Sequence, residues 1–399
     1  MPFEVPSSWV WTTVGEISQS ILYGVSESAK SQGAYRLLRI TDIQDNTVNW
    51  DTVPFTDYEN DKADAYLLKD GDILFARTGA TVGKSYLVNS LKEKAIYASY
   101  LIRVQTNHYV LPAFVKYFFE SGFYWEQVLG NSVGIGQPNV NGTILSNLEL
   151  PIPPIMEQKR IVKELGEWLS IIDKIEEGKE RIQKVISLAK SKILNLAIHG
   201  KLVPQDPTDE PAAELLKRIN PKAEITCDNG HYQKLPKGWA VIRVGNVAKY
   251  TNGRAFKPEE WESTGLPIIR IQNLNDADAP YNRSSVMHEQ KYLIKDGDLL
   301  FAWAASIGTY IWSGENAWLN QHIFKVEPYP FIDKAFLFYA FQAMISEFYK
   351  NSHGSGMVHI TKKQFEEITL LLPPLSEQIR IIECLEQTFS ILDSINCNL

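Results

Sequence analysis

The segment Pro151-Ile-Pro-Pro-Ile-Met-Glu157-Gln158-Lys-Arg-Ile161 begins the stretch of sequence that decides the fold. After it, apolar residues recur in alternating steps of four and three for about five heptads, interrupted only at Lys179. This spacing is typical of a coiled coil rather than of a helix in a globular core. The residues of this heptad seam are Ile161, Leu165, Trp168, Ile172 and Ile175, followed by Ile182, Ile186, Ala189, Ile193 and Leu196.

Helix signals flank the heptads on both sides. Proline fits the first turn of a helix, where the backbone amide has no partner, so Pro153 and Pro154 mark an entrance. Gly200 followed by Pro204 fits an exit. The sequence therefore predicts one long spacer helix over residues 157–199.

The same opening occurs a second time, as Leu372-Pro-Pro-Leu-Ser-Glu377-Gln378-Ile-Arg-Ile381, at an offset of 377 − 157 = 220. The heptad recurs after it at Ile381, Leu385, Thr388, Leu392 and Ile395. Leu399 corresponds to Lys179, so the second helix is predicted to be shorter than the first.

The regions before the two helices also repeat, which predicts a tandem duplication. Val5-Pro6-Ser-Ser-Trp9 matches Leu235-Pro236-Lys-Gly-Trp239, and residues 66–76 differ from residues 292–302 at two positions only. We predict an α+β protein with two α/β target recognition domains related by internal duplication and separated by long antiparallel coiled-coil helices. The predicted parts are domain 1 (1–150), spacer helix (151–200), linker with a short helix (201–234), domain 2 (235–371) and the truncated spacer helix (372–399).

Shorter patterns predict elements inside each domain. The predicted strands are residues 37–43, 73–77 and 94–104, with Asp-Gly turns before the second strand at 70–71 and before its counterpart at 296–297. The predicted helices are residues 112–127, 212–219 and 332–349.

Composition places the chain among soluble globular proteins of ordinary hydrophobicity, at 44% hydrophobic and 22% charged residues. The first residues lack the features of a signal peptide, and no apolar run is long enough to cross a bilayer. Cys227, Cys384 and Cys397 lack metal-type spacing and suit a reducing compartment. We therefore expect a cytoplasmic protein without membrane contact. The net charge of −7 predicts that any DNA affinity is local or depends on a partner.

The sequence contains only partial matches to known catalytic motifs. Gly79-Ala-Thr-Val-Gly83-Lys84-Ser85 resembles a phosphate-binding P-loop, but it is one residue short and a strand pattern follows it. Glu-x-Lys pairs on the heptad helix are ordinary solvated residues, and the seven histidines form no metal-like cluster. The sequence thus predicts a non-catalytic protein with no metal and no cofactor of its own.

Polar loops recur in both domains, and their residues differ while the surrounding scaffold matches. Arg77 aligns with Trp303, and Asn139 with His359. Arginine can pair with guanine and amide side chains with adenine, while lysine, serine and glycine-loop amides suit phosphates. The candidate DNA-binding residues are Arg39, Thr41, Arg77, Thr78, Lys84, Gln137, Asn139 and Asn141 in domain 1, and Arg254, Lys257, Arg270, Gln272, Asn273, Ser306, His353, His359 and Lys362 in domain 2.

Taken together, these motifs resemble the specificity subunit of type I restriction–modification systems, over nearly the whole chain. The resemblance implies two target recognition domains that each read half of a bipartite double-stranded DNA site, and helices that fix the unread spacer. It also implies methylation subunits docked on the helices and restriction subunits in the assembly. S-adenosylmethionine, ATP and Mg would be bound by those partners, and the specificity subunit is not itself catalytic.

The shortened second helix departs from the family pattern. It leaves Ile161, Leu165, Trp168, Ile172 and Ile175 without a helical partner, so we predict that this stripe binds a partner. A methylation subunit, a second copy of this chain, or the recognition domains themselves are the candidate occupants. Two other functions stay open: the specificity subunit of a fused restriction–methylation enzyme that cuts on both sides of its site, and a coiled-coil scaffold that does not bind DNA.

Overall fold

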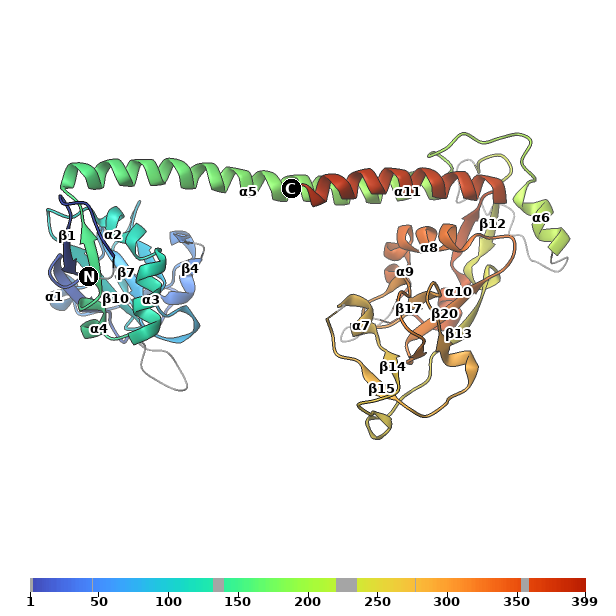
Figure 1. Cartoon of the computed structure of the whole chain (residues 1–399), viewed down its shortest axis with the longest axis horizontal. Coiled ribbons are helices and arrows are strands. Elements are labelled where there is room, and N and C mark those ends of the chain that lie inside the picture. The colour runs from blue at the N-terminus through green and yellow to red at the C-terminus, as the bar shows by residue number, and fades with distance from the viewer. Residues whose placement is uncertain (1–2, 45, 132–139, 220–234, 277, 353–358) are drawn as a thin grey trace. The chain divides into compact units, whose positions relative to one another are not determined.

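The computed structural model describes residues 3–44, 46–131, 140–219, 235–276, 278–352 and 359–399. The chain divides into two compact units, one ending at Glu176 and the other covering Glu177–Leu399. The boundary falls inside the long helix α5 (Ile155–Ile198), and each unit carries one α/β domain (Figure 1).

The first unit is built on an antiparallel four-stranded sheet in the order β2 (Ser18–Tyr23), β10 (Leu101–Thr106), β7 (Ile73–Ala76), β8 (Ser85–Leu87). A second sheet has the order β6 (Phe55–Thr56), β3 (Tyr35–Leu38), β9 (Ala95–Tyr97), in which β3 and β9 are parallel. The pair β1 (Val10–Thr13) and β11 (Glu149–Ile152) leads into α5. The remaining elements are β4 (Ile43–Gln44), β5 (Thr47–Val48), α1 (Asn60–Ala63), α2 (Pro112–Phe118), α3 (Gly122–Asn131) and α4 (Gly142–Ser146).

The second unit repeats this plan. Its main sheet has the order β13 (Ala248–Asn252), β20 (Ile323–Pro328), β17 (Leu299–Ala302), β18 (Gly308–Ile311), and its second sheet β15 (Asn282–Ser284), β14 (Leu266–Ile269), β19 (Ala317–Leu319), β16 (Leu293–Ile294). The pair β12 (Ala240–Arg243) and β21 (Thr369–Leu372) leads into α11 (Leu375–Cys397). The other helices are α6 (Ala212–Ile219), α7 (Ile271–Asn275), α8 (Lys334–Ala343), α9 (Ile345–Lys350) and α10 (Lys362–Glu367).

The main-sheet strand β7 shows why the matching segments fold alike. All four of its side chains are buried, as are those of β17. Strands buried on both faces read as continuous apolar runs. The preceding glycines Gly71 and Gly297 have φ of 96° and 79°, a conformation that suits glycine in a tight turn. The predicted Asp-Gly turns are confirmed.

Four predicted elements are shorter than their sequence patterns or divided in two. The strand predicted over residues 37–43 ends at Leu38, because the Arg39 amide donates to the Asp42 carboxylate (2.9 Å) and the chain enters a 3₁₀ turn. The segment 94–104 forms β9 and β10, which belong to different sheets. The helices predicted over 112–127 and 332–349 are each two helices, while α6 has the predicted bounds.

A glutamine fixes the start of each long helix. Gln158 accepts a hydrogen bond from the Leu111 amide (2.9 Å) and donates to the carbonyl oxygens of Tyr109 (3.2 Å) and Pro153 (2.9 Å). Gln378 makes the same three bonds, to the amide of Asp333 and the carbonyls of Phe331 and Pro373. The glutamine of the repeated Glu-Gln dipeptide therefore has a structural role, which is to attach the start of each long helix to its domain.

In the second unit, α11 runs antiparallel beside the last part of α5 (Figure 1). Lys190 of α5 pairs with Asp393 of α11 (2.5 Å) and lies 5.2 Å from the centre of the Phe389 ring. Ile186 is buried, and Ile193 packs against the core of this unit. The predicted antiparallel pairing of the two helices is confirmed in this region.

In the first unit, most of the heptad seam is exposed. The exposed fractions are 39% for Leu165, 58% for Trp168, 47% for Ile172 and 65% for Ile175. Ile161 is half-buried beside the aromatic residues of its own domain. No described helix of the chain has the length and apolar character to span a membrane.

Candidate nucleic-acid interface

In the first unit, polar and aromatic side chains meet where β2 and β7 end and β10 begins. The Arg77 guanidinium lies 5.0 Å from the centre of the Tyr23 ring, within the range of a cation–π contact. The Arg77 amide donates to the carbonyl of Tyr100 (3.1 Å), whose side chain is 62% exposed. The buried Nε of Arg77 has no hydrogen-bond partner. This edge thus presents an arginine stacked on one tyrosine, with its backbone bonded to a second.

The same edge of the second unit has the same backbone and different side chains. The Trp303 amide donates to the His322 carbonyl (3.0 Å), and its indole Nε1 donates to the Asn252 side chain (3.0 Å). The Trp303 and His322 rings lie 4.7 Å apart, and His322 has a φ of 73°. Burial lowers the pKa of His322, and His359 lowers it further. The site is therefore largely uncharged at neutral pH, unlike its counterpart.

Glycines hold this shared frame in place. A side chain at Gly24 would collide with the Tyr97 carbonyl oxygen, and one at Gly253 with that of Asn320. Only glycine permits such a close approach of two backbones. Tyr23 and Asn252 directly precede these glycines; neither was predicted from the sequence, and their place before an aligned glycine is the signal that could have revealed them.

A second polar group of the first unit lines a pocket of about 490 Å³. The pocket brings together Thr41 and Lys84, both exposed, from the loops that follow β3 and β7. On its wall, Lys116 pairs with Glu120 (2.7 Å) and donates to Ser85 (3.2 Å). Arg39, next to this group, pairs with Asp42 (2.7 Å), and this bond raises the pKa of Arg39. Lys84 is thus the exposed cation of this pocket.

Two arginines of the second unit lie against aromatic rings. Arg254 lies 4.7 Å from the Phe256 ring centre and pairs with Glu260 (2.5 Å), and this bond is the main reason that the pKa of Glu260 falls to about 2. Arg270 lies 5.3 Å from the Trp261 ring centre. Each arginine has one buried guanidinium nitrogen without a partner. The rings orient both guanidinium groups before any ligand binds.

The structure gives three predicted residues local structural roles. Asn141 caps α4 by accepting from the Ile144 amide (2.9 Å). Asn273 is buried and bonds the backbone of Arg270, Ala279 and Pro280. Lys362 pairs with Glu366 one turn along α10 (3.6 Å).

The other predicted residues fall into three groups. Lys257 and Gln272 are exposed and close in sequence to the two arginines, Lys257 after β13 and Gln272 in α7. Thr78, Ser306 and His359 are half-buried, and His359 pairs in a β-bridge with Ala304. Gln137, Asn139 and His353 lie outside the described residues.

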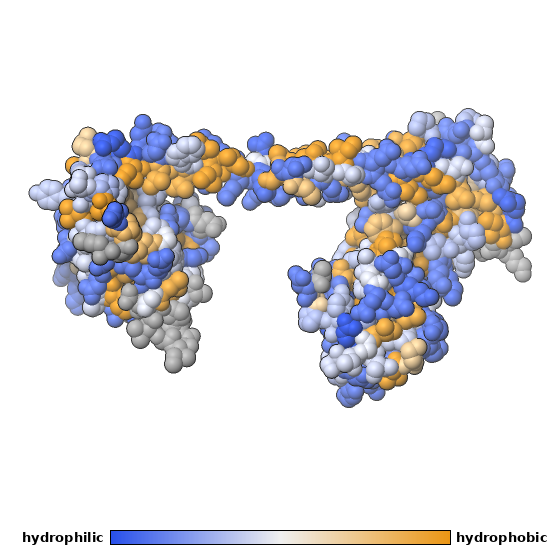
Figure 2. All heavy atoms as spheres, viewed as in Figure 1, coloured by the Kyte–Doolittle hydropathy of each residue, from blue (hydrophilic) through white to orange (hydrophobic). Residues whose placement is uncertain are grey.

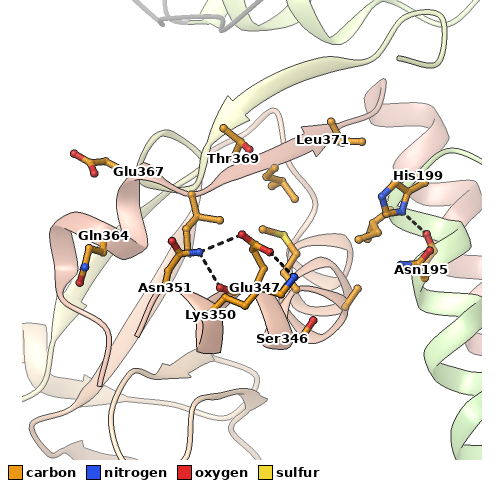
Figure 3. Close-up of a pocket in the computed structure, with 15 residues that line it drawn as sticks. Asn195, His199, Ser346, Glu347, Lys350, Asn351, Gln364, Glu367, Thr369 and Leu371 are labelled. Atoms are coloured by element: carbon orange, nitrogen blue, oxygen red, sulfur yellow. Dashed lines mark hydrogen bonds and ion pairs between the residues drawn. The ribbon is translucent and has the colours of Figure 1, made fainter. Parts of the chain in front are cut away.

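A larger pocket lies in the second unit, where the end of α5 meets α9, α10 and β21 (Figure 3). Its volume is about 630 Å³. The polar side chains that line it bond one another: Asn351 donates to Glu347 (3.1 Å), which also pairs with Lys350 (3.5 Å). None of the predicted DNA-binding residues lines it. The charged side chains Glu347 and Lys350 of this pocket bond each other, so the pocket does not resemble a DNA-binding surface.

Comparisons with known proteins agree with this duplicated plan. Residues 6–184 and 236–398 both match the family described as the type I restriction modification DNA specificity domain. The chain is 25% identical to the specificity subunit of the type I restriction enzyme EcoAI from Escherichia coli, over 97% of this chain and 78% of that one. It is 23% identical to the EcoKI specificity subunit of Escherichia coli strain K12, over 98% and 84%.

Solved structures share the fold at lower identity. A chain from a structure of type I R-M system assembly and conformational transition has a TM-score of 0.73 and 19% identity, covering 100% of this chain and 94% of that one. The HsdS subunit from Thermoanaerobacter tengcongensis has a TM-score of 0.53 and 19% identity, covering 99% and 93%. The chain belongs to the type I restriction–modification DNA specificity family, as a protein with two copies of the specificity domain.

Proposed function

We propose that this chain is the DNA sequence-recognition and scaffold subunit of a type I restriction–modification complex. Each domain reads one half of a bipartite site, and the helices fix the unread spacer and dock methylation subunits. The observation that carries this proposal is the pair of matching sheet edges with different side chains: Arg77 against Tyr23 in one unit, and Trp303 with His322 in the other.

The two edges favour different base contacts. The Arg77 guanidinium lies against the Tyr23 ring, and arginine pairs well with guanine in the major groove. Trp303 and His322 offer apolar contact and a neutral imidazole, so they read shape and base edges without adding positive charge. Two half-sites of different sequence follow from this difference.

Cationic residues next to each edge position the DNA backbone. In the first unit these are Lys84 with the hydroxyl of Thr41, and in the second Lys257 with Arg254 and Arg270. Phosphate contacts fix orientation and carry no sequence information by themselves. With a net charge of −7, the chain relies on these local groups and on its partners for affinity.

The exposed seam of α5 is the docking surface for a methylation subunit. Leu165, Trp168, Ile172 and Ile175 are exposed along one helix, and Figure 2 shows apolar surface along it. Exposed apolar stripes of this kind usually bind partners. The methylation subunits supply S-adenosylmethionine, and the restriction subunits use ATP and Mg.

The test is the methylation pattern of the assembled complex in cells. Wild type should give a two-part motif with one modified adenine in each half. Arg77→Ala should relax one base position in one half-site and leave the other half unchanged, because one good bidentate contact contributes about 1–3 kcal/mol of discrimination. Trp303→Ala is the matched variant and should change only the other half-site. A single-part motif, or a change in both halves from either variant, contradicts the proposal.

A further inference from the structure

In the second unit, residues 200–219 bind the surface where the domain meets α11. Asp209 pairs with Arg380 (2.6 Å), and its side chain is almost fully buried. Gln205 donates to Glu377 (3.3 Å), which also accepts from the Trp239 indole (3.0 Å). Burial raises the pKa of Glu377, against these two hydrogen bonds. Residues 200–219 thus cover the Glu377 carboxylate and help to bury it.

Apolar contacts complete this surface. The Ala212 amide donates to the Gly238 carbonyl (2.8 Å), which places α6 against the domain. Leu215 and Leu216 of α6 are buried in the same core cluster as Trp239. Behind the segment, Ile381 and Leu385 of α11 are fully buried.

The first unit carries the same surface residues. Internal duplication places Pro6 at the position of Pro236, Trp9 at Trp239, Glu157 at Glu377 and Arg160 at Arg380. Residue types that contact residues 200–219 in one unit are therefore present in both.

In the first unit these residues lack the contacts that their counterparts make with residues 200–219. The buried Nε1 of Trp9 has no hydrogen-bond partner, and Arg160 is exposed with no ion pair among the described residues. Val10 is 65% exposed, whereas its counterpart Ala240 is 3% exposed. Leu165 is 39% exposed, whereas Leu385 is fully buried.

An apolar pocket of about 280 Å³ lies at this surface, within the first unit. Its lining includes Trp9, Phe118, Ile161 and Leu165. Arg160 is exposed and directly precedes the lining residue Ile161 on α5. The surface therefore combines an apolar pocket with the cation of Arg160, which forms no ion pair among the described residues. A helix with an apolar face, preceded by a carboxylate, would complement both features.

We propose that this surface docks a segment of a separate polypeptide with the chemistry of residues 200–219. That segment is an amphipathic helix of about two turns, preceded by a loop whose carboxylate pairs with Arg160. Its apolar face fills the pocket, and its docking brings Glu157 and Trp9 into the enclosed arrangement seen for Glu377 and Trp239. This inference rests on the duplicated contacts and does not depend on DNA recognition.

A second copy of this chain is a poorer occupant. Its own residues 200–219 already bind its second unit through the contacts described above. That segment is covalently attached there, so its effective concentration exceeds that of any segment arriving from solution. Exchange between copies would expose one surface for each surface that it covers.

The experiment uses the full-length chain and a fluorescently labelled peptide of residues 197–219 as the probe. Anisotropy titration up to about 1 mM peptide should give saturable binding of one peptide per chain. Arg160→Glu should weaken this binding about tenfold or more, the effect expected from losing a partly enclosed ion pair. A peptide carrying Asp209→Arg should recover binding to Arg160→Glu, which a merely unfolded variant would not do.

Lys159→Glu is the matched control, because it makes the same charge change one residue away, at the position of Ile379 rather than of Arg380. It should leave peptide binding nearly unchanged. Absence of saturable binding to wild type overturns the proposal. Self-association of the chain in light scattering that is lost in Arg160→Glu would identify a second copy as the occupant and would also overturn it.

Discussion

Two tryptophans at equivalent positions have different surroundings. Trp239 donates its indole hydrogen to the buried carboxylate of Glu377, while Trp9 has a buried indole nitrogen without a partner. A hydrogen bond to a charged group contributes more than a neutral one, and its loss leaves a buried carboxylate short of a donor. The two residues therefore provide a matched pair in which ring size is constant and the hydrogen bond differs.

We expect Trp239→Phe to lower the free energy of unfolding by about 1.5–3 kcal/mol more than Trp9→Phe does. Both substitutions remove the same ring volume, so the difference isolates the indole hydrogen bond to Glu377. Urea denaturation of the two variants and wild type measures it. Equal losses in the two variants would show that the Trp9 indole is bonded in solution.

Single residues were the least predictable level of this molecule. Asn141 and Asn273 have residue types suited to reading adenine, yet the local backbone uses them as a helix cap and as a buried turn support. A sequence does not reveal whether a polar side chain is already bonded nearby. Tyr23 and Asn252 were missed for the opposite reason, since an aromatic and an amide at aligned positions share no chemistry that marks a site.

At the level of elements, periodicity predicted long segments well and short ones less well. The heptads gave α5, whose observed bounds are Ile155–Ile198, because many seam positions support the same period. The segment 94–104 was predicted as one strand, although residues 98–100 carry the chain from one sheet to another. Three residues of turn have no periodicity to detect.

We predict that α5 sets the length of the unread spacer. Inserting four helix-forming residues after Gly178 lengthens the helix by about 6 Å, which is close to two base-pair steps of B-DNA. Methylated sites in cells should then have a spacer longer by about two base pairs, with both half-sites unchanged.

The control for the insertion is Gly178→Ala, which changes helix propensity without adding length. A side chain at Gly178 would meet no other atom within 4 Å, so the substitution introduces no clash. It should leave the spacer unchanged. A spacer that is also unchanged by the insertion would mean that another element sets it.

For the whole molecule, the internal duplication was the most informative sequence feature. It predicted that both units share one plan, and the equivalent sheets and the two glutamine-bound helix starts confirm this. The duplication could not predict which contacts differ between copies. The covered Glu377 and the uncovered Arg160 depend on residues 200–219, which are present once in the described chain.

We predict that the two domains are independent readers. Exchanging residues 1–150 for those of a relative should change one half-site and leave the other half and the spacer intact, because Gln158 bonds only backbone groups, which a homologous domain also supplies. Methylation mapping of cells that carry the hybrid measures all three. The reciprocal exchange of residues 235–371 is the control, and a hybrid that altered both halves together would rule out independent reading.

The three hydrogen bonds of Gln158 have a mechanical consequence. A helix of 44 residues is a lever of roughly 66 Å, so a tilt of about 3° at its base displaces its tip by about 3.5 Å. That displacement is about one base-pair step. If α5 sets the spacer, as we propose, weakening the three hydrogen bonds of Gln158 should broaden the distribution of spacer lengths by about one base pair without changing the mean length.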